Sequence, residues 1–536
     1  MLSLLLLLSA QLPLLQCQPL VLSSVEALVA ALASPPPSGP FHLAISGVLH
    51  LASPLTLTSS HSGLHLSAAH AGSGLTLGPA AALRLQGADH LTLSGLSIAR
   101  LGGGPATPSS WHALPAALSA QGCTHLTLTR LAVQGGVRLA GCQHSALTRS
   151  DISNALGAQN GTCAYVPHCG ISASLTPCNL TLADNLIHDC RYSGQGSVYA
   201  AAAQGVLLGA QGGDAPVAAL GCTTGVVVRN NNLTGIDQMG IRVATDYDCA
   251  SALNQVLLNK VENWGQLSAK AGGDTSDSGC LYQYGHWHAP GNNFSFNFCA
   301  SRNASWGQNG MYLDDAASGT TVHGNVFFNS TGGSAIKLNG GSFNTVANNL
   351  VIGGNSLGFA VCRGLRPPLA YIYTCANPNT GGAWLKVLAE NNYTQPPWAT
   401  AFPFYADWCS RTAFGPSATA CAPPGAPPQY GCASFPLGNT VTLHAGVAML
   451  RPGGTFDIPV APGFPFLDPY SHCPQFVVDG QYNSLSQIAS LPGPLADYFV
   501  DPAAEDFTLL GSAPLFAQLP GFQSIPFRDI GIRSHS

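Results

Sequence analysis

Apolar and polar residues alternate along much of the first third of the chain, and glycine-containing turns interrupt the alternation. Three segments align by eye: LRLQGADHLTLSGLSIA from Leu83, LSAQGCTHLTLTRLAVQ from Leu118 and VRLAGCQHSALTRSDIS from Val137. Each consists of an alternating stretch, a turn and a second alternating stretch. Because successive side chains of a strand point to opposite faces, the pattern predicts short, half-buried strands joined by tight turns.

A later series of segments is marked by an asparagine that is followed two residues later by an apolar residue. Its last two steps are 28 and 24 residues long, close to one coil of a β-solenoid. Stacked coils lie about 4.8 Å apart, so the amides would hydrogen-bond from coil to coil. The alternative is that Asn is simply a turn former, but its fixed apolar neighbours favour the ladder. The members are Asn185, Asn231, Asn259, Asn297, Asn325 and Asn349.

These repeats predict an all-β protein, a right-handed parallel β-helix over residues 41–364. An antiparallel sandwich would explain the alternation but not a recurring register of about 24 residues. Residues 18–40 resemble a capping helix followed by a proline-rich break. Residues 365–436 are rich in Cys, Pro and aromatic residues and predict an insertion that packs on the solenoid as a lid or a cap. Residues 437–536 return to strand patterning and are expected to close the solenoid.

Residues 1–17 read as a secretory signal peptide, because a short run of leucines is followed by Gln, Pro and small residues. A membrane anchor is the weaker alternative, since the run is short and contains Pro13. Cleavage after Cys17 would leave 16 of the 17 cysteines, and an even number in an exported chain favours disulfides. No CxxC spacing is present, which argues against a zinc site.

The composition narrows the classes of partner. Charged residues make up 8% of the chain, with 19 Lys and Arg against 24 Asp and Glu, which argues against nucleic-acid binding and against a polybasic membrane-surface protein. A hydrophobic content of 46% argues against disorder. We expect a secreted glycoprotein of the extracellular space or cell wall, without cofactor or metal and monomeric. Seven glycosylation sequons fit this location: Asn160, Asn179, Asn232, Asn293, Asn303, Asn329 and Asn392.

The alternation also predicts which side chains leave the solenoid on one sheet face. In four successive coils the apolar neighbours should point inward, leaving Arg242, Tyr282, Tyr312 and Lys337 in an outward column. Asp314, Tyr284 and Cys280 should point outward as well. Aromatic faces stack on sugar rings, and charged groups hold hydroxyls or carboxylates, so the column predicts the floor of a groove for an extended glycan.

Three aspartates are the candidate catalytic residues. Asp277 precedes one strand of this face, and Asp314 and Asp315 follow the next, so the sequence suggests that they are neighbours in space. Hydrolysis of a glycosidic bond requires two carboxyl groups, one as acid and one as nucleophile or base. Alternatively, the aspartates cap turns through local hydrogen bonds. On the residues alone the two interpretations are about even, with Asp315 the stronger turn candidate.

Other side chains are candidates for contact with substrate. His286 and His288 form an H-x-H element that suits substrate contact or plain surface better than metal binding. Trp306 could stack on a sugar or pack a loop. Lys337 and Arg242 could neutralise a uronate and remove its C5 proton in a lyase, or Lys337 could pair with Asp314.

Several motifs together resemble bacterial parallel β-helix glycosidases of the α-L-fucosidase and xylanase type. They are DSGCLY from Asp277, GMYLDDAASGTTVHGNVF from Gly310, GGSFNTVANNLV from Gly340, PPW from Pro396 and the ending DFTLL…GFQSIPFRDIG from Asp506. The resemblance covers roughly residues 80–536 and implies a pectate-lyase-like fold. It also implies catalytic roles for Asp277 and for Asp314 or Asp315. An arginine that the family has after the first motif is absent here, whereas Arg363 matches another family element and is expected to line the far end of the cleft.

The leading hypothesis is therefore a secreted glycoside hydrolase that acts on a cell-wall or matrix polysaccharide. A polysaccharide lyase is the second hypothesis, although the sparse acidic residues offer no obvious calcium site. A non-catalytic glycan-binding or structural protein is the third, because a solenoid makes a long binding face without any chemistry.

Overall fold

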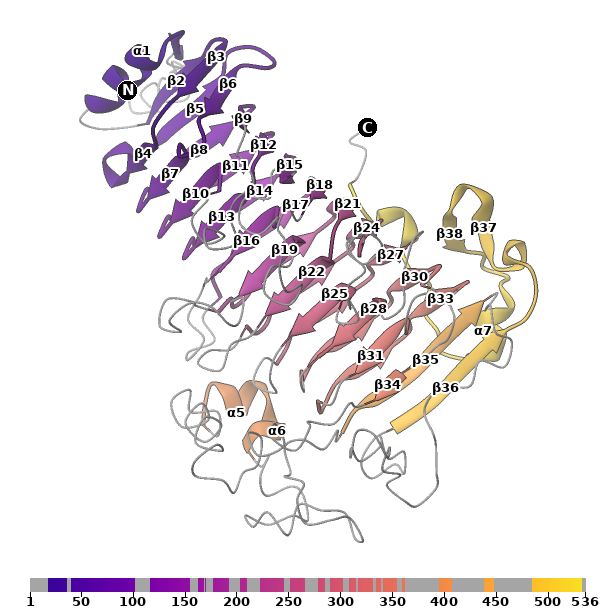
Figure 1. Ribbon diagram of the computed structural model, residues 1–536. Helices are drawn as coiled ribbons and strands as arrows, with labels where there is room; N and C mark the ends of the chain where they lie inside the picture. Colours follow the sequence, from indigo (N-terminus) through magenta and orange to yellow (C-terminus); the bar gives the residue numbers. More distant parts are fainter. Residues whose placement is uncertain are drawn as a thin grey trace, which may run out of the picture.

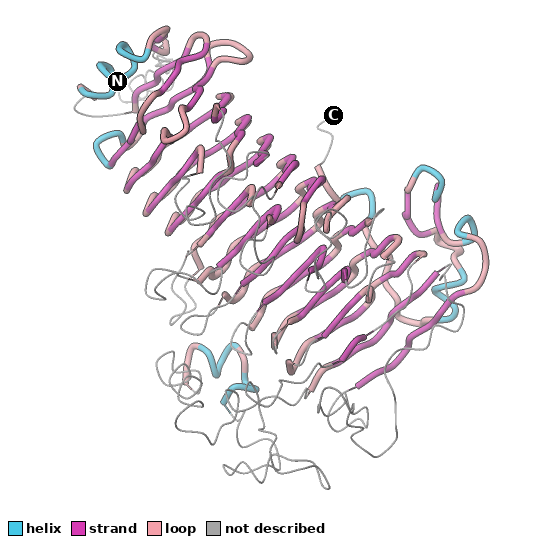
Figure 2. The backbone as a smooth tube through the Cα atoms, viewed as in Figure 1, coloured by secondary structure: helices cyan, strands magenta, loops and turns pink. Residues whose placement is uncertain are grey.

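The computed structural model describes residues 18–35, 40–101, 116–154, 162–167, 169, 177–191, 203–209, 222–244, 251–265, 278–284, 290–301, 308–314, 317–330, 334–338, 341–353, 359–361, 395–406, 438–447 and 484–532. Its strands stack as successive rungs of an elongated body (Figures 1 and 2). All the described pairings within the two large sheets are parallel, and each coil from β2 to β34 contributes one strand to each of three ladders. The predicted parallel β-helix is thus confirmed.

The first ladder is an 11-stranded sheet, and it carries the candidate residues Arg242, Tyr282, Tyr312 and Lys337. Its strands pair in the order β34-β31-β28-β25-β22-β19-β16-β13-β10-β7-β4. They are β4 (Leu55–Thr58), β7 (Leu83–Gln86), β10 (Leu118–Gln121), β13 (Val137–Ala140), β16 (Ala164–Val166), β19 (Gln204–Gly209), β22 (Met239–Ala244), β25 (Ser278–Tyr284), β28 (Gln308–Leu313), β31 (Ile336–Leu338) and β34 (Phe359–Val361).

The other two ladders belong to a single 25-stranded sheet. Ladder A, as we name it, contains β1 (Leu20–Leu22), β2 (Phe41–Ile45), β5 (Leu64–Ala68), β8 (Thr92–Ser94), β11 (Thr127–Thr129), β14 (Ala146–Thr148), β17 (Thr181–Ala183), β20 (Val227–Arg229), β23 (Gln255–Leu257), β26 (Asn293–Ser295), β29 (Thr321–His323) and β32 (Thr345–Ala347). Ladder B contains β3 (Val48–Leu51), β6 (Gly74–Leu77), β9 (Ser97–Arg100), β12 (Ala132–Gln134), β15 (Asp151–Asn154), β18 (Leu186–Cys190), β21 (Asn232–Ile236), β24 (Lys260–Glu262), β27 (Phe298–Ala300), β30 (Val326–Phe328) and β33 (Leu350–Ile352). β35 (Thr440–Val447) continues both ladders and pairs with β36 (Ser484–Leu491).

The core is the interior of the coil, where aliphatic side chains of equivalent register stack on one another. Leu128, for example, lies between Leu93 and Leu147 of the neighbouring coils, and all three are fully buried. Burial of one such side chain stabilises the fold by roughly 1.5–3 kcal/mol. The parallel register repeats this contact from coil to coil. The apolar positions of the alternating pattern in the sequence are therefore the residues that form the core.

The asparagine ladder predicted from the sequence is present. Each side-chain amide from Asn185 to Asn325 donates to the Oδ1 of the next member, at 2.9–3.0 Å. A second column, which the sequence analysis missed, runs through another turn: Asn254 donates to Asn292, and Asn344 donates to Asn439. Buried polar groups at both turns are therefore satisfied from coil to coil.

One expected side-chain direction is wrong. Cys280 lies in the hydrophobic core and is bonded to Cys299 of ladder B, so its side chain does not leave the sheet. Leu281 belongs to the same core, so the inward–outward alternation breaks at this point of β25. The neighbouring coils have Gly240 and Gly310 here, and a Cβ on Gly240 would lie 2.5 Å from the carbonyl oxygen of Cys280. Two further disulfides are described, Cys163–Cys190 and Cys169–Cys178, whereas Cys123 and Cys142 are buried free thiols.

Both ends of the chain cover the solenoid, but in different ways. Helix α1 (Val25–Ala33) starts at Ser24, whose Oγ accepts from the backbone of Ala27, and buries Leu28 and Leu32 against the first coil. Residues 437–536 were expected to form strands and a cap that close the solenoid. The strands β35 and β36 continue the coils. The residues after β36 pack along the outer side of ladder B and reach back as far as Asn232, whose Oδ1 accepts from the backbone of Ile532 (Figure 1).

The remaining elements are short. The C-terminal segment contains β37 (Phe499–Asp501), β38 (Asp506–Leu509) and α7 (Pro514–Gln518), and the expected insertion contains α5 (Trp398–Ala401) and α6 (Pro403–Ala406). Phe404 of α6 stacks on Phe343 at 4.6 Å, which places this part of the insertion beside the solenoid. None of the described helices is long and apolar enough to cross a membrane. Single 3₁₀ turns are η1 (Ser59–His61), η8 (Leu495–Asp497), η9 (Pro502–Ala504) and η10 (Phe527–Asp529).

Candidate functional site

The outward column predicted on the 11-stranded sheet is present. Arg242 of β22 pairs with Tyr282 of β25, Tyr282 with Tyr312 of β28, and Tyr312 with Lys337 of β31. These strands lie side by side in Figure 1. Because parallel pairing in register repeats the same side of the pleat, the four side chains leave the same face of the sheet.

Arg242 lies against two tyrosines. Its Cζ is 5.5 Å from the ring centroid of Tyr282 and 5.0 Å from that of Tyr284, and the two rings are stacked at 6.5 Å. A guanidinium over aromatic faces gains a cation–π attraction that grows as water is excluded. Its Nε is buried and has no hydrogen-bond partner among the residues that the structure describes.

Tyr282 connects this arginine to the carboxylate. The phenol of Tyr282 donates a hydrogen bond to Oδ2 of Asp314. Burial raises the pKa of Tyr282 well above its ordinary value, and the negative charge of Asp314 is the second cause of this rise. The phenol therefore stays protonated. The backbone N–H of Asp314 donates to the carbonyl of Gln283 at 2.9 Å, which fixes the aspartate at the end of β28. Asp314 therefore has a fixed position and a permanent donor.

The column ends at a second cation–aromatic contact. The Nζ of Lys337 is 4.0 Å from the ring centroid of Tyr312, and Tyr312 meets Tyr282 edge to face at 5.1 Å. The contact stabilises the charged ammonium of Lys337. One carboxylate, two cations and three phenol rings thus form one continuous cluster on the sheet.

The cluster is not the open groove floor that the sequence predicted. Its side chains leave the coil, but Arg242, Tyr282, Tyr312 and Asp314 have exposed fractions of only 7, 3, 1 and 5%. Met239 packs with the two buried tyrosines and with Tyr284. Charges in such a poorly hydrated place interact more strongly than at an open surface. Tyr284 and Lys337 are partly exposed and form the accessible part of the cluster.

Other candidate residues lie outside the described residues: Asp277, Asp315, His286, His288, Trp306 and Arg363. The suggested pairing of Asp277 with Asp314 or Asp315 therefore stays a prediction.

The column extends further along the solenoid than the sequence analysis recognised. Arg138 of β13 is opposite Tyr165 of β16, and its Cζ is 5.9 Å from the tyrosine ring centroid. Burial raises the pKa of Tyr165, and the nearby Arg138 and Arg242 partly offset this rise. The sequence contained a signal for this extension of the column, because both residues occupy the outward position of their short alternating strands, VRLA and AYV.

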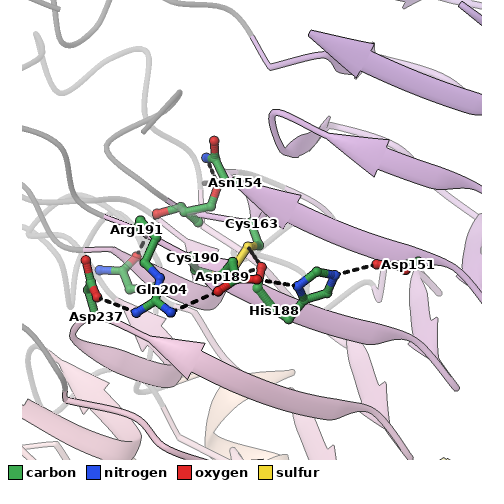
Figure 3. The surroundings of a disulfide bond; sticks show 10 residues. Asp151, Asn154, Cys163, His188, Asp189, Cys190, Arg191, Gln204 and Asp237 are labelled. Atoms are coloured by element: carbon green, nitrogen blue, oxygen red, sulfur yellow. Dashed lines mark hydrogen bonds and ion pairs between the residues drawn. A yellow bond between two sulfur atoms is a disulfide. The ribbon is translucent and has the colours of Figure 1, made fainter. Parts of the chain in front are cut away.

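A separate chain of charged residues lies beside the Cys163–Cys190 disulfide (Figure 3). The imidazole of His188 lies between two carboxylates, 2.7 Å from Asp151 and 2.8 Å from Asp189. Arg191 then joins Asp189 to the buried Asp237. Burial alone would lower the pKa of His188, but hydrogen bonds to the two carboxylates outweigh it and raise the pKa.

This raised pKa predicts a pH dependence of stability. The folded state binds the His188 proton more tightly than the unfolded state, so the stabilisation is complete below the unfolded pKa of about 6.5 and is lost as the pH rises through the folded value. We expect the melting temperature of the wild type to fall more between pH 6 and pH 8 than that of His188→Gln. The difference should be small, of the order of 1 kcal/mol or less. The exposed His50 provides the control, and an equal effect of His50→Gln would contradict the assignment.

Comparison with known proteins adds little beyond the fold. No protein-family model and no curated protein matches the sequence. Similar solved structures include the Dettilon tailspike protein (13% identity, TM-score 0.39), a PL6 family alginate lyase (14%, 0.39) and a tailspike mutant of E. coli bacteriophage HK620 in complex with a pentasaccharide (12%, 0.42). The matches cover 63, 64 and 63% of this chain and 59, 45 and 60% of those chains, so the chain spans about half the length of these proteins. At such low identities and scores, any inference about function has to come from the side chains of this chain.

Proposed function

We propose that this protein is a polysaccharide-acting enzyme of the extracellular space, and specifically a glycoside hydrolase in which Asp314 is a catalytic carboxylate. The observation that carries the proposal is the hydrogen bond from the buried phenol of Tyr282 to Asp314, next to the guanidinium of Arg242. An acid, base or nucleophile needs a fixed position and a poorly hydrated surrounding, and Asp314 has both.

Each described residue then has a role. Asp314 would donate a proton to the glycosidic oxygen, take a proton from the attacking water, or attack the anomeric carbon, while Tyr282 holds its carboxylate. Arg242 would bind a substrate oxygen through its guanidinium, and Tyr284 would offer a ring face to a sugar. Asp277 or Asp315 would supply the second carboxyl group that hydrolysis requires.

A lyase is the second candidate function, since two cations flank the tyrosines. Removal of a C5 proton by Lys337 would require its neutral amine, whereas the ring of Tyr312 stabilises the ammonium. Hydrolysis is therefore the better supported reaction. The motif resemblance to fucosidase- and xylanase-type enzymes agrees with it. The disulfides favour an oxidising compartment, and therefore a secreted protein.

Product analysis tests this proposal. The purified secreted protein is incubated with fucosylated, xylan-type and uronate-containing glycans, in parallel with an Asp314→Asn variant. New reducing ends from the wild type alone, without unsaturated sugars that absorb ultraviolet light, are the expected result. Unsaturated products would show that the protein is a lyase and not a hydrolase. Glycan retention without any products would show that the protein is a binding or structural protein and not an enzyme.

A further inference from the structure

Three histidines stack on one another at a corner of the solenoid that the proposed catalysis does not use. His90, His125 and His144 each stand two residues before a strand of ladder A, at β8, β11 and β14. Their ring centroids are 4.3 and 5.3 Å apart, with interplanar angles of 19° and 14°. The backbone of all three residues lies in the left-handed region, with φ of 52°, 52° and 48°. The repeated turn thus places one imidazole above another.

Asp89 joins the first two histidines. Its two carboxylate oxygens lie 2.9 Å from Nδ1 of His90 and 2.9 Å from Nδ1 of His125. Thr124 donates its hydroxyl to Oδ1 of Asp89 at 2.6 Å and so fixes the carboxylate. The two ring nitrogens and a carboxylate oxygen all lie within 4.8 Å of one another. The side chains are 66, 49 and 47% exposed for His90, His125 and Asp89, so an ion could reach them.

We propose that Asp89, His90 and His125 bind a divalent transition-metal ion such as Zn²⁺, with water completing the coordination. Imidazole nitrogen and carboxylate oxygen suit these ions. In a tetrahedral site with bonds of about 2.0–2.1 Å, neighbouring ligand atoms are about 3.3 Å apart. Small movements of exposed side chains bring the present atoms to that spacing. Thr124 supplies the outer-shell hydrogen bond that orients a ligating carboxylate.

The same column offers a matched control. His144 has the same turn and stacks on His125, but its Nδ1 lies 3.2 Å from the amide of Asn179, away from Asp89. Asn179 occupies the equivalent turn position in the next coil with φ of 53°. Asparagine is therefore compatible with the backbone at each histidine, and His→Asn removes a ligand without straining the turn. Because His90→Asn and His125→Asn each create an Asn-Leu-Thr sequon and His144→Asn does not, the wild type and all variants are exported to a bacterial periplasm, where disulfides form and N-glycans are not attached.

Calorimetric titration of the intact secreted chain with Zn²⁺ in a non-chelating buffer tests the site. We expect the wild type to bind one ion here, His90→Asn and His125→Asn each to weaken binding at least ~10-fold, and His144→Asn to change it less than about 3-fold. Melting temperatures near that of the wild type would show that the variants are folded.

Three results would overturn the assignment. The wild type could fail to bind Zn²⁺. The His144→Asn variant could lose as much affinity as His90→Asn, which would indicate a diffuse histidine surface. Binding could also survive in the double variant His90→Asn/His125→Asn, which would place the ion elsewhere, for example at the buried thiols of Cys123 and Cys142. None of these results depends on whether the protein cleaves a glycan.

Discussion

Replacing Asp314 by Asn is expected to reduce kcat/KM by about 10²- to 10⁴-fold, the range typical of a lost acid–base group. The amide is nearly isosteric, and its oxygen can still accept the hydrogen bond from Tyr282, so the fold and the aromatic cluster should persist. Only the ability to exchange a proton or to attack the sugar is lost. The measurement is steady-state kinetics on the glycan that the product panel identifies, together with the melting temperature.

The companion variant Tyr282→Phe separates catalysis from positioning. It keeps the ring that faces Arg242 and Tyr312 but removes the donor to Asp314. We expect a smaller loss, about 10-fold and mainly in kcat, because the carboxylate remains but is no longer held. Tyr165→Phe, in the same column and without a contact to Asp314 among the described residues, should leave kcat within about 2-fold. An Asp314→Asn variant with wild-type activity would remove Asp314 from the catalytic centre.

The orientation of the candidate side chains was predictable from the sequence because it depends on local geometry. Successive residues of a strand alternate between faces, and a solenoid repeats its register from coil to coil. Arg242, Tyr282, Tyr312 and Lys337 could therefore be placed in one column without any knowledge of distant contacts. The asparagine ladder was predictable for the same reason, since its members recur at a fixed place in the repeat.

The burial of the same column was not predictable, since coverage of a sheet face depends on segments that are remote in sequence. The course of the C-terminal tail was not predictable for the same reason, because it depends on contacts between remote segments. The amide of Asn230, for example, donates to the carbonyl of Asp529, 299 residues away. Cys280 was misplaced because a disulfide to Cys299 and small neighbours, Gly240 and Gly310, overrode the alternation. The second asparagine column was hidden because 95 residues separate Asn344 from Asn439.

Replacing Asn297 by Ala is expected to destabilise the solenoid by about 3–5 kcal/mol, because several buried groups lose their partners at once. The side-chain amide of Asn297 donates to the carbonyl of Val256 at 2.9 Å and to Oδ1 of Asn325 at 3.0 Å. Its Oδ1 accepts from both the backbone and the side chain of Asn259, each at 3.0 Å. With no exposed surface at Asn297, water cannot easily replace these bonds.

Denaturant unfolding of Asn297→Ala and of a control in the preceding coil, Gln255→Ala, measures the effect. Gln255 is half-buried in β23. Its amide donates to the carbonyl of Leu253 at 3.4 Å, and its Oε1 accepts from the amide of Asn293 in the next coil at 3.0 Å. Because water can replace these partly exposed bonds, the loss should cost only about 1 kcal/mol. Equal losses of unfolding free energy in the two variants would mean that the asparagine ladder does not contribute specifically to stability. A large loss at Asn297 alone would show that it holds neighbouring coils in register. Because β25 carries Tyr282 and Asp314 directly follows β28 within these coils, the same variant should then lose activity at a lower temperature than the wild type.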